Sequence, residues 1–296
     1  MLSILIPTYN FDIRRLIFDL HEQAEKEEIK FEIIVADDAS DHAFRHINKE
    51  TEILYNVKYI QLNKNSGRSE IRNFLAKQAK YNYLLFIDCD MMIENSNFIH
   101  NYLLHAKDSS VICGGINYST EPPENQKFFF RWYYGIHREK SSAKKRSLNP
   151  YASFMTGNFF INKDIFKSIK FNEQLKEYGH EDTLFGIELK RKNINITHIE
   201  NTLIHNGLET IKVFISKTEK GIDNLIFLTD NFDYPELFEN IKLLRAAKKL
   251  RLLKPLFLIS LNIFTPLLIK NSDNKKLKLF LFDFYKLGYY FKKNNS

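Results

Sequence analysis

The stretch YLLFIDCDMMI (residues 83–93) runs from five apolar, strand-prone residues directly into two acids, Asp88 and Asp90. Residues i and i+2 of a strand face the same side, so both carboxylates can enter one site. Two adjacent anions repel each other, and burying them unpaired is costly. A divalent cation with oxygen ligands would relieve that repulsion. In the alternative, one Asp caps the next helix and the other is solvated.

Three further apolar runs precede this strand, separated by stretches with helical spacing. The apolar runs are LSILIP (2–7), FEIIVADD (31–38) and VKYIQLN (57–63), and the helical stretches are residues 14–26, 42–50 and 69–80. This alternation predicts an α/β fold with a mostly parallel central sheet flanked by helices. Pro7, Asp38 and Asp88 lie at expected strand ends, where ligands of such sheets bind.

The composition is that of a folded protein with a sizeable core, since 44% of the 296 residues are hydrophobic. The two cysteines, Cys89 and Cys113, cannot form a disulfide framework, which favours a reducing, cytoplasmic setting. Residues 1–10 lack a basic start and a cleavage site, so we expect a strand there rather than a signal peptide. No apolar run reaches the roughly 18 residues of a membrane span.

The positive charge is concentrated in the last part of the chain. Residues 242–296 hold thirteen Lys and Arg against two acids, a net +11, so the remaining residues carry −4 of the total +7. A general nucleic-acid surface is therefore disfavoured. We expect a sheet domain at residues 1–210 and a helical, basic and apolar extension at 211–296. The extension would lie on an anionic membrane surface, or pack on the domain or a second subunit.

Four segments resemble, in order, spacing and placement at strand ends, the inverting family 2 glycosyltransferases of the GT-A fold. They are SILIPTYN (3–10), FEIIVADDAS (31–40), NKNSGRSEIRN (63–73) and FIDCD (86–90). TGNFFINKDIF (156–166), GHEDTLFG (179–186) and NTLIHNGLE (201–209) resemble acceptor-side elements of the same group. The whole is similar to bacterial members that act on cell-surface polysaccharides. The resemblance implies a nucleotide-sugar donor, most naturally a UDP-sugar.

The resemblance assigns the first strand ends to the nucleotide. Pro7 and Tyr9 would form a wall for a uracil-like base, although Tyr9 could equally be a packed core aromatic. Asp38 would accept a hydrogen bond from the base's imide N–H, and Asp37 would support the ribose or the loop. The alternative for these acids is a helix N-cap.

The next segments would hold the diphosphate and the sugar. Gly67 would allow a tight turn, and Arg68 and Arg72 would pair with the diphosphate or the base-binding Asp. A surface arginine is the alternative for either. Gly157 would lie under the donor sugar, where a glycine permits close backbone approach.

The resemblance also implies a metal site and a base. Asp88 would bind ribose and metal, with Asp90 the firmer ligand of Mn²⁺ or Mg²⁺, and His205 a further ligand unless it is structural. Asp182 would take the proton of the acceptor hydroxyl, while Glu181 would bind the acceptor or orient the loop. Acids at a helix N-terminus are also stabilised without any catalytic duty.

Other parts of the chain are open to more than one interpretation. Trp132 could stack on an acceptor sugar or pack in a core. The acceptor would be a saccharide or a lipid-linked saccharide, with the enzyme in the cytoplasm or peripheral on the inner face of the membrane. Rival classes are a noncatalytic nucleotide-sugar or glycan-binding protein and a haloacid-dehalogenase-like phosphatase. Dinucleotide and P-loop fingerprints are absent from the sequence.

Overall fold

The computed structural model describes residues 1–106, 111–175, 178–269 and 275–294. The chain divides into two compact units. The first comprises residues 1–120, 139–176 and 181–207, and the second comprises residues 121–138, 177–180 and 208–296. The second unit thus includes a segment from the middle of the sequence, and a catalytic domain at 1–210 with an extension at 211–296 stays a prediction.

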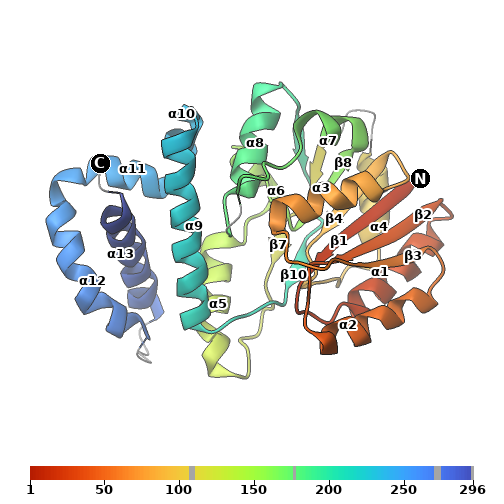
Figure 1. The fold of residues 1–296 in the computed structure, drawn as a ribbon, viewed down its shortest axis with the longest axis horizontal. Coiled ribbons are helices and arrows are strands. Elements are labelled where there is room, and N and C mark those ends of the chain that lie inside the picture. The colour runs from red at the N-terminus through yellow and green to blue at the C-terminus, as the bar shows by residue number, and fades with distance from the viewer. Residues whose placement is uncertain (107–110, 176–177, 270–274, 295–296) are drawn as a thin grey trace. The chain divides into compact units, whose positions relative to one another are not determined.

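A seven-stranded sheet forms the centre of the first unit, in the order β3-β2-β1-β4-β8-β6-β9 (Figure 1). Its strands are β1 (Leu2–Thr8), β2 (Phe31–Asp37), β3 (Val57–Gln61), β4 (Tyr83–Ile87), β6 (Val111–Cys113), β8 (Asn158–Asn162) and β9 (Ile196–His198). β3, β2, β1 and β4 are parallel, β8 is antiparallel to β4 and β6, and β9 is parallel to β6. The predicted mostly parallel sheet is therefore confirmed.

Helices lie between the strands of this unit, as the apolar spacing predicts. They are α1 (Arg14–Lys26), α2 (His42–Lys49), η1 (Glu50–Ile53), α3 (Arg68–Gln78), α4 (Phe98–His105), α6 (Ala143–Ser147), α7 (Lys163–Ile169) and α8 (Glu181–Arg191). Apolar residues of α3, α7 and α8 join one face of the sheet in a single buried cluster. α1 and α4 contact each other and contribute nothing to that cluster, so they cover the other face.

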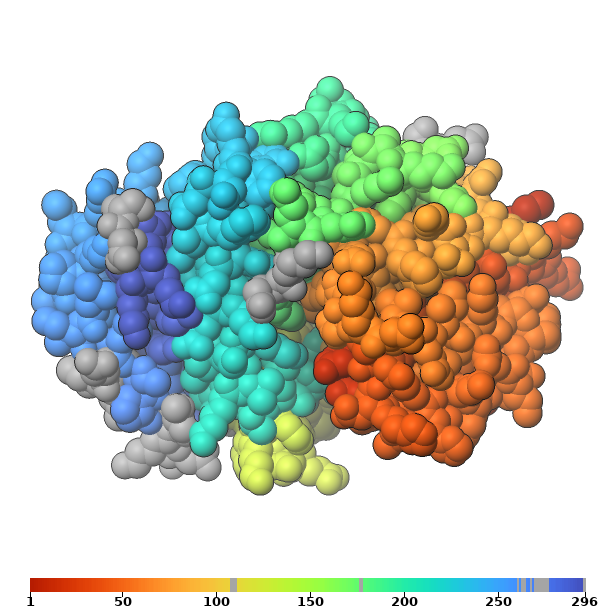
Figure 2. All heavy atoms as spheres, viewed as in Figure 1, coloured from red at the N-terminus to blue at the C-terminus, as the bar shows by residue number. Residues whose placement is uncertain are grey.

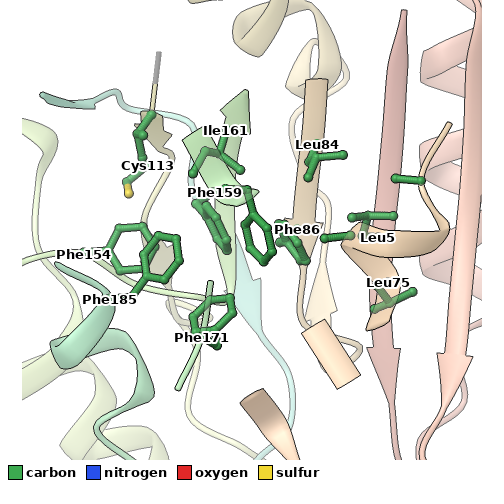
Figure 3. Packing of buried hydrophobic residues seen from close by; sticks show 14 of the residues in the cluster. Leu5, Leu75, Leu84, Phe86, Cys113, Phe154, Phe159, Ile161, Phe171 and Phe185 are labelled. Atoms are coloured by element: carbon green, nitrogen blue, oxygen red, sulfur yellow. The ribbon is translucent and has the colours of Figure 1, made fainter. Parts of the chain in front are cut away.

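Aromatic packing locks β4 against its antiparallel neighbour β8. Phe86 and Phe159 are paired in register and stack with ring centroids 4.7 Å apart (Figure 3). Phe171 and Phe185 extend the same cluster, with centroids 4.5 Å apart. Close packing of large rings leaves little freedom to move. The end of β4, where the two acids follow, is thereby held in place.

A second, three-stranded sheet has the order β5-β10-β7. Its strands are β5 (Met91–Met92), β7 (Ile116–Asn117) and β10 (Leu203–His205). β10 runs antiparallel to β5, and His205 pairs with Met91. This pairing brings the end of the chain's first unit beside the residues that follow β4.

The second unit is helical, which confirms the predicted C-terminal helices. Its helices are η2 (Gln126–Phe128), α5 (Phe129–Tyr134), α9 (Ile211–Asn231), α10 (Pro235–Asn240), α11 (Lys242–Lys249), η4 (Arg251–Leu253), α12 (Lys254–Ile269) and α13 (Lys275–Lys293), and a π-helix η3 (Gly135–Glu139) follows α5. Phe130, Phe214 and Phe282 meet in its core. Trp132 is buried against Phe129, as the core-packing alternative expects. Within the described residues, no helix combines the length and hydropathy that a membrane crossing requires.

The aromatic cluster allows a test of the fold. Replacing the buried Phe159 by Ala should lower the free energy of unfolding by about 3–5 kcal/mol, because the variant loses apolar burial and leaves a cavity. Phe18, on the exposed side of α1, is the matched control, and its replacement by Ala should cost about 0.5 kcal/mol or less. Urea denaturation followed by circular dichroism measures both. Equal costs at the two sites would contradict the assigned core.

Candidate functional site

The two acids lie in a turn between β4 and β5. β4 ends at Ile87, the Asp88 N–H donates to the Gly157 carbonyl (3.1 Å), and the Met91 N–H donates to the Asp88 carbonyl (3.2 Å). The expectation that both acids lie on one extended strand is therefore wrong, because the strand stops one residue earlier. The turn instead directs each carboxylate to its own partners.

Asp88 is neutralised by two guanidinium groups. Arg68 Nη2 lies 3.2 Å from its Oδ2, and Arg72 pairs with its Oδ1. The two arginines are four residues apart on α3, so they project from one face of that helix. Burial raises the pKa of the Asp88 carboxyl, but Arg72 and Arg68 outweigh it and hold that pKa below its ordinary value. Asp88 is thus a fixed anion, paired with both arginines that the sequence assigns to the donor.

Arg68 also reaches the second acidic motif. Its Nε forms an ion pair with Glu181 at the start of α8. Burial raises the pKa of Glu181, yet the charges of Arg68 and Arg72 lower it below the ordinary value overall. Through this one arginine, the turn after β4 and the GHED segment belong to a single charge network.

Asp182 differs from its neighbour in protonation. Burial and the negative charge of Glu181 raise the pKa of Asp182 to about 6. Hydrogen bonds, including one from the Thr183 N–H (2.6 Å), oppose this rise. Two adjacent acids whose environments push their pKa values apart are typical of acid–base sites. Glu181 stays charged beside Arg68, while Asp182 can hold or release a proton near neutral pH.

Asp90 faces His205 across the β5–β10 pair. His205 Nε2 lies 3.5 Å from Asp90 Oδ2, and the buried Nδ1 of His205 has no hydrogen-bond partner among the described residues. Gly207 closes the site from one side, since a Cβ there would meet the Asp90 side chain, 2.8 Å from its Cβ. A side chain at position 207 would therefore displace Asp90.

These two side chains fit a divalent metal. A carboxylate oxygen and an imidazole nitrogen are donors that Mn²⁺ accepts, and Mg²⁺ is often held by one or two protein groups plus water and phosphates. Across the ranges that the structure describes, no group of three or more His, Cys, Asp or Glu could hold a metal. Asp90 and His205 would therefore share the metal with substrate phosphates. Asp88, occupied by guanidinium groups, is less available than the sequence suggests.

At the end of β2, Asp37 has a structural role. It is fully buried and accepts hydrogen bonds from the Tyr59 hydroxyl (2.5 Å) and the Ser40 N–H (2.8 Å). Arg45 Nε adds a charge at 3.7 Å. Each oxygen of this carboxylate has a hydrogen-bond partner in the loop region, which fits loop support, one of its two expected roles.

Asp38 holds the loop before α3. It accepts hydrogen bonds from the Ser66 N–H (2.6 Å), the Ser66 hydroxyl (2.9 Å) and the Gly67 N–H (3.1 Å). Gly67 has φ +84°, a left-handed conformation that glycine adopts without strain. The helix-cap alternative does not apply to Asp38, because Asp41 occupies the N-cap position of α2.

The remaining predicted residues lie around these acids. Tyr9, just after β1, is 52% exposed, so it is not a packed core aromatic, and Pro7 is half-buried. Gly157 lies against Asp88, where a Cβ would come 3.2 Å from Oδ2 and 2.9 Å from Met91 Cε. Sequence reasoning missed Gly207, although a glycine two residues after a strand-end histidine was visible in the sequence.

Comparisons with known proteins concern the family and the fold. A family model described as Glycosyl transferase family 2 matches residues 3–169. Chondroitin synthase of Escherichia coli is 30% identical over 240 residues, which cover 69% of this chain and 34% of that protein. The chain therefore spans about a third of the length of that relative.

Two solved structures share the fold. The mannosyltransferase PcManGT from Pyrobaculum calidifontis, in complex with GDP-Man and Mn²⁺, has a TM-score of 0.64 at 10% identity and covers 100% of this chain and 88% of its own. Glucosyl-3-phosphoglycerate synthase from Mycobacterium tuberculosis, in complex with Mn²⁺, UDP and glucosyl-3-phosphoglycerate, has a TM-score of 0.52 at 14% identity, over 77% of this chain and 79% of its own. The fold is GT-A, with a mostly parallel sheet flanked by helices.

The Asp88 network makes a prediction about stability. Arg72→Met should lower the free energy of unfolding by about 3 kcal/mol, because it leaves a partly buried carboxylate without its buried cation. Adding Asp88→Asn should restore much of that loss, and urea denaturation measures both. Because the pKa of Asp88 is lowered, the pair's contribution is present above pH 3.8 and lost as pH falls through the folded-state pKa. A loss unchanged by Asp88→Asn would contradict the pairing.

Proposed function

Because this chain belongs to glycosyl transferase family 2, we propose that it transfers a sugar from a nucleotide sugar to a saccharide acceptor, with a divalent metal and inversion at the anomeric carbon. The observation that carries the proposal is the charge network in which Arg68 joins Asp88 to Glu181, two acids far apart in the sequence. Because Arg68 pairs with Asp88 and with Glu181 within the first unit, the network supports a site in which Asp88 lies on the donor side and the GHED segment supplies the base.

The donor we propose is a UDP-sugar. The exposed Tyr9 offers a ring face to a base at the carboxyl end of β1, where α/β sheets bind ligands. Two proteins of this fold bind a nucleoside diphosphate group together with Mn²⁺, one as GDP-Man and one as UDP. Mn²⁺ or Mg²⁺ held by Asp90 and His205 would stabilise the negative charge that develops on the departing diphosphate.

The side chains of the network would carry out the remaining steps. Arg68 and Arg72 hold positive charge beside the expected diphosphate position, with Asp88 between them. Asp182 accepts the proton of the acceptor hydroxyl while the hydroxyl oxygen bonds to the anomeric carbon. At the same time, the bond from that carbon to the phosphate oxygen breaks. With a pKa of about 6, the carboxyl of Asp182 is mostly deprotonated at neutral pH and can act as a base. Glu181, charged and paired, positions Arg68.

The acceptor we propose is a growing surface polysaccharide, free or lipid-linked. The similarity to a chondroitin synthase supports polysaccharide synthesis. A cytoplasmic enzyme that is peripheral on the inner face of the membrane would meet such an acceptor. The phosphatase alternative needs a free aspartate nucleophile as the first acid, whereas Asp88 is held by two guanidinium groups.

The metal site gives a first test of the proposed function. Asp90→Ala and His205→Ala should each weaken Mn²⁺ binding by about tenfold or more, because even outer-shell partners of metals have effects of that size. Titration calorimetry with Mn²⁺ in the presence of UDP measures the affinity, and Asp182→Asn serves as a control that keeps it. Unchanged Mn²⁺ affinity in both ligand variants would disprove this site.

The proposed base gives a second test of the function. Asp182→Asn should keep UDP and Mn²⁺ binding and lower kcat by about 10²–10⁴-fold, since it removes general-base assistance. In the wild type, kcat should rise with pH through about 6, because only the deprotonated carboxylate accepts a proton. That ascending limb should vanish in the variant. Full turnover by Asp182→Asn would overturn the assignment.

A further inference from the structure

The second unit contains a pocket lined by three cations that form no ion pair with any described residue. Its volume is about 310 Å³, and its lining residues are Thr229, Asp230, Phe238, Leu244, Ala247, Lys248, Arg251, Lys254, Tyr290, Phe291 and Asn294. We call it the basic pocket. Three cations face one carboxylate there, so the pocket has an excess of positive charge. Apolar side chains form the rest of its wall.

The three cations come from consecutive short elements. Lys248 lies in the last turn of α11, Arg251 begins η4 and Lys254 begins α12, and all three line the same pocket. Lys254 Nζ donates to the Asn294 carbonyl (3.0 Å). No acid forms an ion pair with any of the three within the described part of the chain.

By contrast, Lys286 and Lys293 of α13 and Arg138 of η3 are each paired with an acid. Lys286 lies 2.7 Å from Asp283, Arg138 pairs with the same carboxylate at 2.5 Å, and Lys293 lies 3.7 Å from Asp223. The unit therefore satisfies several of its cations internally but leaves those of the basic pocket for an anion. Tyr290 and Asn294 add polar groups to the same wall.

An exposed apolar stripe alternates with these cations along the chain. Leu252 of η4 is 95% exposed, and Leu256 and Ile259, three residues apart on one face of α12, are 62% and 63% exposed. Within this unit, α13 lies between α9 and α12, so α12 forms an edge (Figure 1). Its side chains are part of the surface drawn in blue in Figure 2.

We propose that the basic pocket binds the headgroup phosphate of an anionic phospholipid while the apolar stripe enters the headgroup layer. A soluble phosphate would account for the cations but not for three large apolar side chains held in water beside them. Basic residues next to an apolar helix face are typical of helices that lie in a membrane interface. This inference specifies the membrane partner proposed above and does not depend on sugar transfer.

The test compares two charge-matched double variants of the full chain. Lys248→Ala with Arg251→Ala removes two pocket cations, and Lys242→Ala with Lys249→Ala removes two exposed cations of α11 outside the pocket. Flotation with vesicles of equal parts phosphatidylcholine and phosphatidylglycerol measures binding. The pocket variant should bind about 25-fold more weakly, at about fivefold per cation, and the control less than about fivefold. Equal losses would overturn the pocket in favour of diffuse attraction.

Two further arms separate the ligand sources. Leu252→Ser with Leu256→Ser should weaken vesicle binding without changing the affinity for inorganic phosphate, measured by calorimetry. If inorganic phosphate bound the pocket and vesicles did not, a soluble anion would replace the lipid in this proposal. Sugar transfer to a soluble acceptor should be unchanged in all three variants, so loss of vesicle binding with intact transfer distinguishes this proposal from the proposed activity.

Discussion

Two guanidinium groups on consecutive turns of α3 neutralise one carboxylate at the end of a buried strand, and the site is built around that charge balance. Asp88 alone would be a costly anion beside the aromatic core. Arg72, almost fully buried, has Asp88 as its carboxylate partner, and its Nη1 donates to the Arg68 carbonyl at 2.9 Å. Removing Asp88 would leave the buried Arg72 without a carboxylate, and removing Arg72 would leave Asp88 with only the more exposed Arg68, so α3 and β4 are tied together electrostatically as well as by packing.

The pairing of Asp88 and Glu181 with arginines also determines the surroundings of the other two acids, Asp90 and Asp182. Because Asp88 is already paired, Asp90 is the acid that we propose as a metal ligand, and it meets His205 because β5 and β10 pair. Because Arg68 takes Glu181 as a second partner, the negative charge next to Asp182 is held in place and raises its pKa. One arginine thereby couples the position of the donor-side turn to the protonation of the expected base.

The local pattern of the sequence was enough to predict the sheet. Apolar runs of strand length, separated by stretches with helical spacing, predicted four parallel strands, and the structure has them as β3-β2-β1-β4. Family 2 and the GT-A fold were predicted from the order and spacing of the motifs, and the family model over residues 3–169 confirms the family. Pairings between distant segments were not accessible in this way, since the periodicity of a strand says which face is buried but not which strand lies next to it. For this reason the sequence did not predict the β5-β10-β7 sheet or the inclusion of residues 121–138 in the second unit.

The sequence by itself determined which residues carry charge at the ends of strands and helices: Asp38, Asp88, Asp90, the GHED acids and the arginines of α3. Only the tertiary structure decided which partners each of these charged groups contacts. Asp38 accepts hydrogen bonds from the N–H groups of Ser66 and Gly67, and Asp88 pairs with two guanidinium groups. The physical reason is that a carboxylate takes the partners that its turn and its packing present within about 3 Å, and those partners come from segments far away in the chain.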